Sequence, residues 1–327
     1  MHTNPVKPLQ FGILGCANIA IRSLMPAISR HPACRLAAVA SRSRDKAALL
    51  ASQYACRAVS YDELVADPAI HAVYVPLPTG LHVEWVMKCL AAGKHVLCEK
   101  SLGCTRDEVR QMVDLARRQN RLLMETFQFR FHAQHAVVKE ILASGLIGDI
   151  RCFRSAFGFP AFPDGKANLR YQKALGGGAL LDAGAYTIKA ATFMLGGGFR
   201  VKAAMLRYVP EHEVDVGGAI CMEHDSGVAI QTAFGFDNFY QCNYEIWGSK
   251  GKLTAKRAFT APPGFAPEIV IETPAGAEVR TLPPDDHFTN MLTRFTDLIQ
   301  SDDYEAEYNE CLTQADLLGQ AWACAGD

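Results

Sequence analysis

The sequence predicts an α/β protein with two domains: a parallel sheet flanked by helices, then an α+β domain with a large, mainly antiparallel open sheet. A chain of 327 residues exceeds the usual size of one compact domain. Short apolar runs alternate with helix-length amphipathic segments up to about residue 126, and strand-like runs dominate after it. The expected domains are therefore 1–126 and 127–327, with the C-terminal helix packing back on the first.

In the first domain, each expected strand is followed by a segment long enough for a crossover helix. The strands are expected at 10–14, 35–40, 57–59, 71–75, 95–98 and 122–125, with helices such as 19–29, 44–53, 81–92 and 106–119 between them. This spacing fits repeated βαβ units, which place the strands parallel in one sheet.

The second domain begins with a helix expected at 134–143 and continues mostly as strands. The strands are expected at 150–159, 199–209, 217–223, 228–236, 241–247, 252–255 and 268–272. Helices are expected at 179–195, 287–300 and 305–323, so this sheet should be backed by helices on one side.

Composition excludes several classes of protein. Lys and Arg number 33 against 34 Asp and Glu, without a block of like charge, which argues against nucleic-acid and membrane partners and favours a small-molecule substrate. The 11 cysteines contain no CxxC pair, and His132 and His135 have no carboxylate at ligand spacing, so we expect neither a disulfide framework nor a metal site. Residues 1–8 carry no apolar signal core, and no segment is long and apolar enough to span a membrane, which predicts a cytoplasmic protein.

The first strand turns into the first helix through Gly12-Ile13-Leu14-Gly15-Cys16-Ala17-Asn18-Ile19-Ala20, the context of a Rossmann dinucleotide-binding fingerprint. Gly15 supplies the tight turn, whereas Ala17 replaces the second glycine. The cofactor-binding residues expected here are Gly15, Ala17, Asn18 and Ile19. A βα turn that needs one glycine for its conformation alone is the alternative.

The cofactor is expected to be NADP(H). After the second strand, Ser41, Arg42 and Ser43 stand where NAD-binding proteins carry an acidic residue, and an arginine there suits a 2′-phosphate. A solvated helix start is the alternative. The fourth strand ends in a rigid turn expected beside the nicotinamide, with Pro76, Leu77, Pro78 and His82 as further cofactor-binding candidates. His82 could instead cap the following helix.

Two further segments carry chemistry. Glu99 and Lys100 follow an apolar strand at the edge where open α/β sheets bind ligands, and Asp182 and Tyr186 follow a glycine run at 176–178. If 179–195 is helical, Asp182 and Tyr186 share one face. Lys100 could then stabilise alkoxide-like charge and lower the pKa of Tyr186, which donates the proton, while Asp182 orients Lys100 or a substrate hydroxyl. A surface lysine, a helix-start carboxylate and a core tyrosine are the alternatives.

The ordered motifs make the chain resemble the Gfo/Idh/MocA family of oxidoreductases over almost its full length. They are the Gly15–Ala20 turn, the run 92–100, Gly145-Leu146-Ile147-Gly148, and the glycine run through Asp182 and Tyr186. The resemblance implies that Lys100 lies near the substrate carbonyl and Glu99 near the nicotinamide ribose. Ser101 departs from the family's Glu-Lys-Pro motif, and Tyr186 stands where histidine is commoner.

A narrower similarity is to sugar-nucleotide 3-ketoreductases, carried by runs at 156–160, 169–171, 244–249, 257–263 and 282–288. It implies NADPH-dependent reduction of a keto sugar, at C3 of a nucleotide-linked deoxyhexose, with Tyr186 and Lys100 as the proton-donor pair. Phe157, Arg170 and Tyr171 join Lys100, Asp182 and Tyr186 as substrate-binding candidates. Arg170 could bind a diphosphate and Tyr171 could stack on a base or sugar, or both could shape the loop.

Other functions remain open. NADP-dependent D-xylose and trans-dihydrodiol dehydrogenases share the Asp-x-Gly-x-Tyr pattern, and a non-catalytic dinucleotide-sensing regulator is a third possibility. The resemblance also implies a homodimer or homotetramer.

Overall fold

The computed structural model describes residues 7–326 and divides into two compact units. The first contains the chain up to Thr126 and Phe288–Leu312, and the second contains Phe127–His287 and the residues from Thr313 onward. Residues 1–6, part of the segment expected to lack a signal core, lie outside the described residues.

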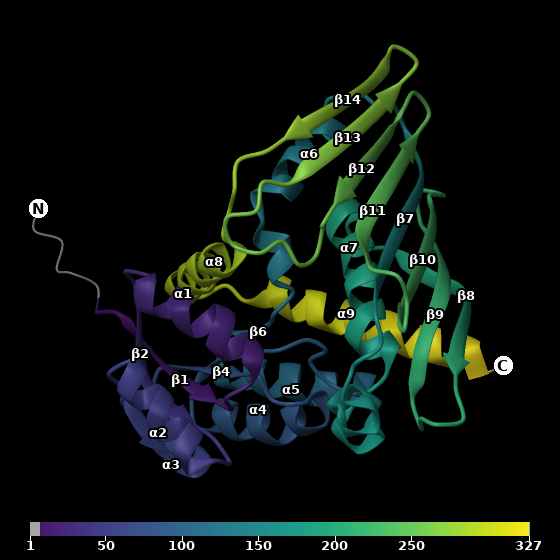
Figure 1. Ribbon diagram of the computed structural model, residues 1–327. Coiled ribbons are helices and arrows are strands. Elements are labelled where there is room, and N and C mark those ends of the chain that lie inside the picture. The colour runs from purple at the N-terminus through teal and green to yellow at the C-terminus, as the bar shows by residue number, and fades with distance from the viewer. Residues whose placement is uncertain (1–6, 327) are drawn as a thin grey trace, which may run out of the picture. The chain divides into compact units, whose positions relative to one another are not determined.

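The first unit is built on a six-stranded parallel sheet (Figure 1). Its strands are β1 (Leu9–Leu14), β2 (Cys34–Ala40), β3 (Arg57–Val59), β4 (Ala72–Val75), β5 (His95–Cys98) and β6 (Leu123–Glu125). Its helices are α1 (Met25–Arg30), α2 (Arg44–Gln53), α3 (Tyr61–Ala66), α4 (His82–Ala91), α5 (Arg106–Gln119) and α8 (His287–Ser301).

The strand order β3-β2-β1-β4-β5-β6 is that of a Rossmann fold, which confirms the predicted fold class. The order in which strands are added to the sheet reverses between the parallel neighbours β1 and β4, and open α/β sheets bind ligands outside the carboxyl ends of strands at such a point. The inner strands β4 and β5 are almost entirely buried, as parallel strands covered on both faces must be.

Helix α8 completes the core of this unit although it comes from the far end of the chain. The ring of Phe295 lies 5.7 Å from that of Phe11 on β1, and the side chain of Thr293 lies 3.0 Å from the imidazole of His31. The first unit therefore draws its core from both ends of the sequence.

The second unit is built on an eight-stranded sheet in which all neighbours are antiparallel except β7 and β10. Its strands are β7 (Ile150–Phe159), β8 (Phe199–Tyr208), β9 (Asp215–His224), β10 (Ala229–Phe236), β11 (Gln241–Gly248), β12 (Lys252–Lys256), β13 (Glu268–Thr273) and β14 (Gly276–Thr281). Helix α7 (Ala185–Leu195) packs on β7 and β10, and α6 (Ala133–Ala143) contacts β11 through His135 and Tyr244 (Figure 1). The last helix is α9 (Glu305–Gly326).

The predicted large, mainly antiparallel sheet is thus confirmed, and three details differ from the prediction. Strand β14 was not expected, and neither was the short helix α3, although Ser60 and Glu63 form a capping box at its start. The segment 179–195 is also not one continuous helix, because Leu180–Gly184 forms a π-helical turn before α7 begins. A similar π-helical turn at Ala20–Leu24 precedes α1.

Among residues 7–326, none of the helices combines the length and apolar character that crossing a membrane requires.

Candidate active site

The turn after β1 has the conformation that the glycine pattern predicts. Gly15 has a φ of 122°, and its amide donates to the carbonyl of Ala40 on β2 at 3.0 Å. A Cβ at this position would lie 2.8 Å from Cδ2 of Leu77, so only glycine fits without a shift. Ala17 and Ile19 are half-buried and Asn18 is exposed, which leaves this loop accessible to a ligand.

The segment after β2 presents hydroxyl and guanidinium groups. Ser43 caps α2 by accepting from the amide of Lys46, and Ser41 accepts from the amide of Ser43. Arg42 and Ser43 are exposed and Ser41 is half-buried. A 2′-phosphate fits this donor set, because it pairs a guanidinium with hydroxyls beside a helix start.

The turn after β4 contributes differently from its prediction. Leu77 and Pro78 are partly exposed, but Pro76 is buried, and the side chain of His82 is fully buried. Both ring nitrogens of His82 face backbone carbonyls, so its side chain does not present an atom for direct cofactor contact. The prediction of His82 as a cofactor ligand is therefore replaced by a role inside the fold.

The loop after β5 carries Glu99 and Lys100, both half-buried. Tyr74 on β4 donates its hydroxyl hydrogen to Oε1 of Glu99 at 2.6 Å, and the Glu99 amide donates to the carbonyl of Val75. Burial raises the pKa of Glu99, while the Tyr74 hydrogen bond acts in the opposite direction. The Lys100–Ser101 peptide is cis, and Ser101 is buried. The loop is therefore well packed despite the missing proline.

In the second unit, Asp182 is joined to Arg170. Nε of Arg170 donates to Oδ2 of Asp182 at 2.6 Å, with side-chain exposures of 37% and 20%. The Asp182 carboxylate raises the pKa of Arg170 further, and Tyr186 adds to this effect. The structure thus brings Arg170, Asp182 and Tyr186 together, and a diphosphate contact of Arg170 stays a prediction beside its role in this loop. Lys100 belongs to the first unit.

The side chain of Tyr186 packs among aromatic rings. Its ring centroid lies 5.1–6.0 Å from those of four phenylalanines, Phe127, Phe129, Phe157 and Phe259. The hydroxyl lies 3.4 Å from the side-chain amide of Gln128, which also reaches the carbonyl of Phe259. The ring is 6% exposed, so apolar packing fixes its position while the amide holds the hydroxyl.

Phe157 is one of the rings that pack on Tyr186, and Tyr171 lies in a neighbouring aromatic cluster. The ring of Tyr171 stacks on the imidazole of His212 at 3.9 Å, with 8° between the planes, and its edge meets Phe162 and Phe236. Because one face of Tyr171 already carries His212, stacking on a substrate base stays a prediction for its other face.

Two residues near the site were not anticipated. Gln128 lies in a segment where polar and aromatic residues alternate, and only its tertiary contact with Tyr186 reveals its position. Asp215 on β9 accepts from the amide of Leu180 at 2.6 Å, just before Asp182. Its separation in sequence from the glycine run explains why pattern alone did not find it.

The two histidines considered for a metal are used otherwise. The ring nitrogens of His135 face the Tyr244 hydroxyl at 2.8 Å and the Ala258 carbonyl at 3.0 Å, and His132 caps α6. Over residues 7–326, no three His, Cys, Asp or Glu side chains gather as a metal site would require.

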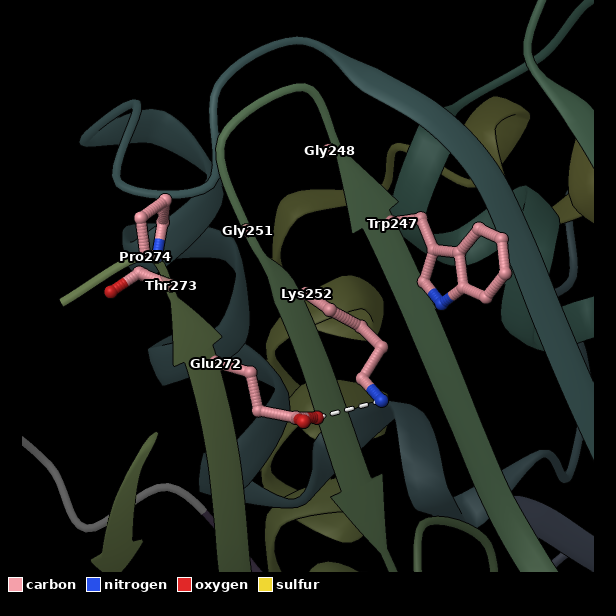
Figure 2. Close-up of a pocket in the computed structure, with 7 residues that line it drawn as sticks. All are labelled: Trp247, Gly248, Gly251, Lys252, Glu272, Thr273 and Pro274. Atoms are coloured by element: carbon pink, nitrogen blue, oxygen red, sulfur yellow. Dashed lines mark ion pairs between the residues drawn. The ribbon is translucent and has the colours of Figure 1, made fainter. Parts of the chain in front are cut away.

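A surface pocket of about 380 Å³ lies on the second unit, apart from the predicted site residues. Figure 2 shows Trp247 on β11, Lys252 on β12 and Glu272 on β13 at its wall, with Lys252 reaching Glu272 at 2.7 Å. This ion pair already satisfies the charges of the pocket, so the pocket is not assigned to the reaction.

Comparisons with known proteins agree with this architecture. The first part of the chain, residues 9–127, matches the model of an oxidoreductase family with an NAD-binding Rossmann fold. Residues 135–254 match the GFO/IDH/MocA C-terminal domain.

Among curated proteins, the chain is 41% identical over 290 residues to a dTDP-3,4-didehydro-2,6-dideoxy-alpha-D-glucose 3-reductase from Saccharopolyspora spinosa, covering 88% of this chain and 87% of that one. It is 34% identical to an NADP-dependent D-xylose 1-dehydrogenase from Haloferax volcanii, covering 90% of each.

A solved structure of a 3-ketoreductase from Actinomadura kijaniata, in complex with NADP and TDP-benzene, is also similar. Its TM-score is 0.93 at 38% identity, covering 97% of this chain and 98% of that chain. With both halves matched by the family models and relatives aligned over most of its length, this chain belongs to the Gfo/Idh/MocA family of oxidoreductases.

Proposed function

We propose that this protein reduces the C3 keto group of a dTDP-linked 3,4-diketo-2,6-dideoxyhexose with NADPH. The observation that supports this most is the full-length likeness to a 3-ketoreductase held with NADP and TDP-benzene, at a TM-score of 0.93. Four curated relatives between 37% and 41% identical carry the same 3-reductase name. We propose NADP(H) as cofactor and a sugar nucleotide as substrate on this basis.

The accessible Gly15 turn and the Ser41–Ser43 segment would hold the cofactor, which supplies the hydride when bound. Side chains of the protein would then stabilise the charge on the carbonyl oxygen and protonate it. Lys100 would place its ammonium against the negative charge that develops on that oxygen, which stabilises the transition state. Tyr186 would donate its hydroxyl proton, so that ketone and hydride together yield the alcohol.

Asp182 and Arg170 would act beside Tyr186. Their ion pair fixes the carboxylate, and the positive charge of Arg170 near Tyr186 favours the phenolate that remains after proton donation. Gln128 would hold the hydroxyl in place before transfer. Solved structures of the Actinomadura relative include variants in which a tyrosine is replaced by phenylalanine and a lysine by alanine or glutamate.

The decisive experiment is a turnover assay with freshly generated diketo sugar nucleotide, followed by loss of NADPH absorbance and by identification of the product alcohol. Turnover with NADPH at much higher kcat/KM than with NADH is expected. A protein that leaves this substrate untouched but oxidises D-xylose or a trans-dihydrodiol with NADP+ would contradict the proposal.

The D-xylose alternative is kept because the Haloferax relative aligns with 90% of the chain. A third outcome, tight NADPH binding without turnover of any of these substrates, would favour a dinucleotide-sensing regulator.

We also propose a homodimer or homotetramer formed through the open face of the eight-stranded sheet. Pairing registers place Met205, Ala219, Ala233 and Ala156 in one row across four strands. Met205 is 66% exposed, and the small side chains beside it form a flat apolar strip on the face away from α7. Light scattering should give a multimer, and Ala233→Glu should yield monomers; a monomeric parent protein would contradict this.

A cytoplasmic location stays a prediction.

A further inference from the structure

His82, at the start of α4, is fully buried and surrounded by backbone carbonyl oxygens. Its Nε2 lies 2.7 Å from the carbonyl oxygen of Leu77. Its Nδ1 lies 3.0 Å from the carbonyl oxygen of Ser101 and 3.3 Å from that of Leu102. One imidazole ring therefore contacts the turn after β4 and the loop after β5.

The loop on the Nδ1 side is the one that carries Lys100. It is also held from β6, because the Leu102 amide donates to Oε1 of the buried Glu125 at 2.8 Å. The carbonyl oxygens of Ser101 and Leu102 thus face Nδ1 of His82, while the Leu102 amide has its acceptor in Glu125.

The turn on the Nε2 side is the one expected beside the nicotinamide. The side chain of Leu77 lies against Gly15, where an added Cβ would come within 2.8 Å of its Cδ2. Through Leu77, the position of His82 also influences the glycine turn after β1. The ring therefore contacts the loops after β4 and β5, and Leu77 of the first of these loops contacts the turn after β1.

Because a carbonyl oxygen only accepts, each contact needs a hydrogen on the ring nitrogen that faces it, and a neutral imidazole carries a hydrogen on only one of its two nitrogens. Burial lowers the pKa of His82, and the nearby positive charge of Lys100 acts in the same direction, whereas the three carbonyls favour the protonated ring. A backbone carbonyl left without a donor in this buried place would be costly. The ring is accordingly part of the packing of both loops and is not replaceable by an apolar side chain of similar size.

We propose that His82 is a positioning residue that fixes the Lys100 loop relative to the Leu77 turn, and so sets where Lys100 stands against the cofactor. The catalytic part of this inference rests on the proposed reduction. The structural part, the link between the two loops, stands on the contacts of His82 alone.

Two matched variants test separately the contact of His82 with the Lys100 loop and its contact with the Leu77 turn. In His82→Asn the amide nitrogen takes the place of Nδ1, and in His82→Gln it takes the place of Nε2. His82→Leu removes both ring nitrogens. Hydrogen–deuterium exchange of segments 77–82 and 99–104 in the full-length protein reports each loop directly, and steady-state kinetics with NADPH report the consequence.

We expect exchange at 99–104 to stay near the parent rate in His82→Asn and to rise about tenfold in His82→Gln and His82→Leu. Exchange at 77–82 should show the reverse order for the two amide variants. Because misplacement by about 1 Å costs up to about a hundredfold, kcat should fall at least about tenfold in His82→Gln and less in His82→Asn. The KM for NADPH should rise more in His82→Asn, which loses the Leu77 contact.

Parent-like exchange in both segments of His82→Leu would overturn the link, as would indistinguishable exchange in the two amide variants. If His82→Leu does not fold, the comparison of the two amides decides alone. A parent protein without reductase activity would remove the proposed function, while the exchange order would still decide whether His82 joins the loops.

Discussion

The hydroxyl of Tyr186 is a single group whose removal leaves the surrounding packing intact. Tyr186→Phe keeps the ring against its four phenylalanine neighbours, so the fold and the affinity for NADPH should not change. We expect kcat to fall by about a hundredfold or more, since a positioned proton donor contributes that much. Tyr208→Phe, at an exposed tyrosine of the same unit, is the matched control for assays of turnover and NADPH fluorescence. An unchanged kcat would remove Tyr186 as the donor.

Lys100 offers an independent test at the residue scale. Lys100→Met keeps much of the side-chain length but removes the ammonium, so turnover should be lost while NADPH binding is largely retained. Titration of NADPH fluorescence and the turnover assay measure the two effects separately. Full activity in this variant would exclude Lys100 from the mechanism.

The ion pair between Arg170 and Asp182 predicts that these residues act as one unit. If Arg170 serves mainly to hold Asp182, then Arg170→Gln and Asp182→Asn should each lower kcat, and the double variant should be little worse than either. A double-mutant cycle on kcat/KM should give a coupling of about 1 kcal/mol. Additive losses, with Arg170→Gln acting mainly on the KM of the sugar nucleotide, would instead favour a diphosphate contact.

At the scale of elements, Asp215 anchors the start of the segment that carries Asp182 and Tyr186. Its Oδ2 accepts from the Leu180 amide, and a Cβ at Gly178 would lie 2.5 Å from its Oδ1. Gly178 has a φ of 120°, so glycine is required there on both grounds. Asp215 on β9 therefore fixes the backbone of the segment that leads from the glycine run to Asp182.

Burial raises the pKa of Asp215 to about 6, and this predicts a measurable pH dependence. The unfolded chain releases this proton near pH 3.9, so the group stabilises the fold fully below about pH 4 and progressively less as the pH rises through 6. By about pH 8 the loss should reach roughly 3 kcal/mol relative to Asp215→Asn. Denaturant unfolding of both proteins between about pH 4 and pH 8 measures it, and parallel curves would contradict it.

The elements show which features sequence patterns can predict. Buried parallel strands such as β4 and β5 are continuous apolar runs, and the motif around Lys100 lies directly after one of them. Strand β14, by contrast, is almost wholly exposed at the sheet edge, so its residues alternate in no recognisable way. The π-helical turn before α7 depends on how Asp215 and the glycine run pack, and no spacing in the sequence reveals it.

The same limit applies to the candidate site. Lys100, Asp182 and Tyr186 were found because they belong to local motifs. The contact of Gln128 with Tyr186 spans 58 residues of sequence, and the buried role of His82 depends on a loop about twenty residues away. Such tertiary partners become visible only once the strands are paired.

For the whole molecule, a cluster of buried histidines in the second unit predicts sensitivity to acid. His132, His135 and His287 lie with ring centroids 5.8–6.5 Å apart, and burial lowers the pKa of each, to about 3 for His135 and about 4 for His287. Asp285 and Asp286 oppose this shift, and Lys139 reinforces it at His135.

The fold keeps these rings neutral, whereas the unfolded chain takes up protons near pH 6.5. The stability they confer is complete above that pH and is lost as the pH falls toward 4, by about 3 kcal/mol for His287 alone. Unfolding free energies measured between about pH 7 and pH 4.5 should therefore fall steeply. His287→Gln should show a shallower fall, and an identical slope in the two proteins would contradict the assignment.

The contact between Phe11 and Phe295 has a consequence for how the protein is made. On the ribosome, β1 is among the first segments to emerge, yet α8 follows only after the entire eight-stranded sheet has been synthesised. At about 5–20 residues per second, the apolar face of β1 waits on the order of tens of seconds for its partner. Nascent chains stalled before α8 should therefore bind chaperones that recognise exposed apolar segments, and full-length chains released from the ribosome should not.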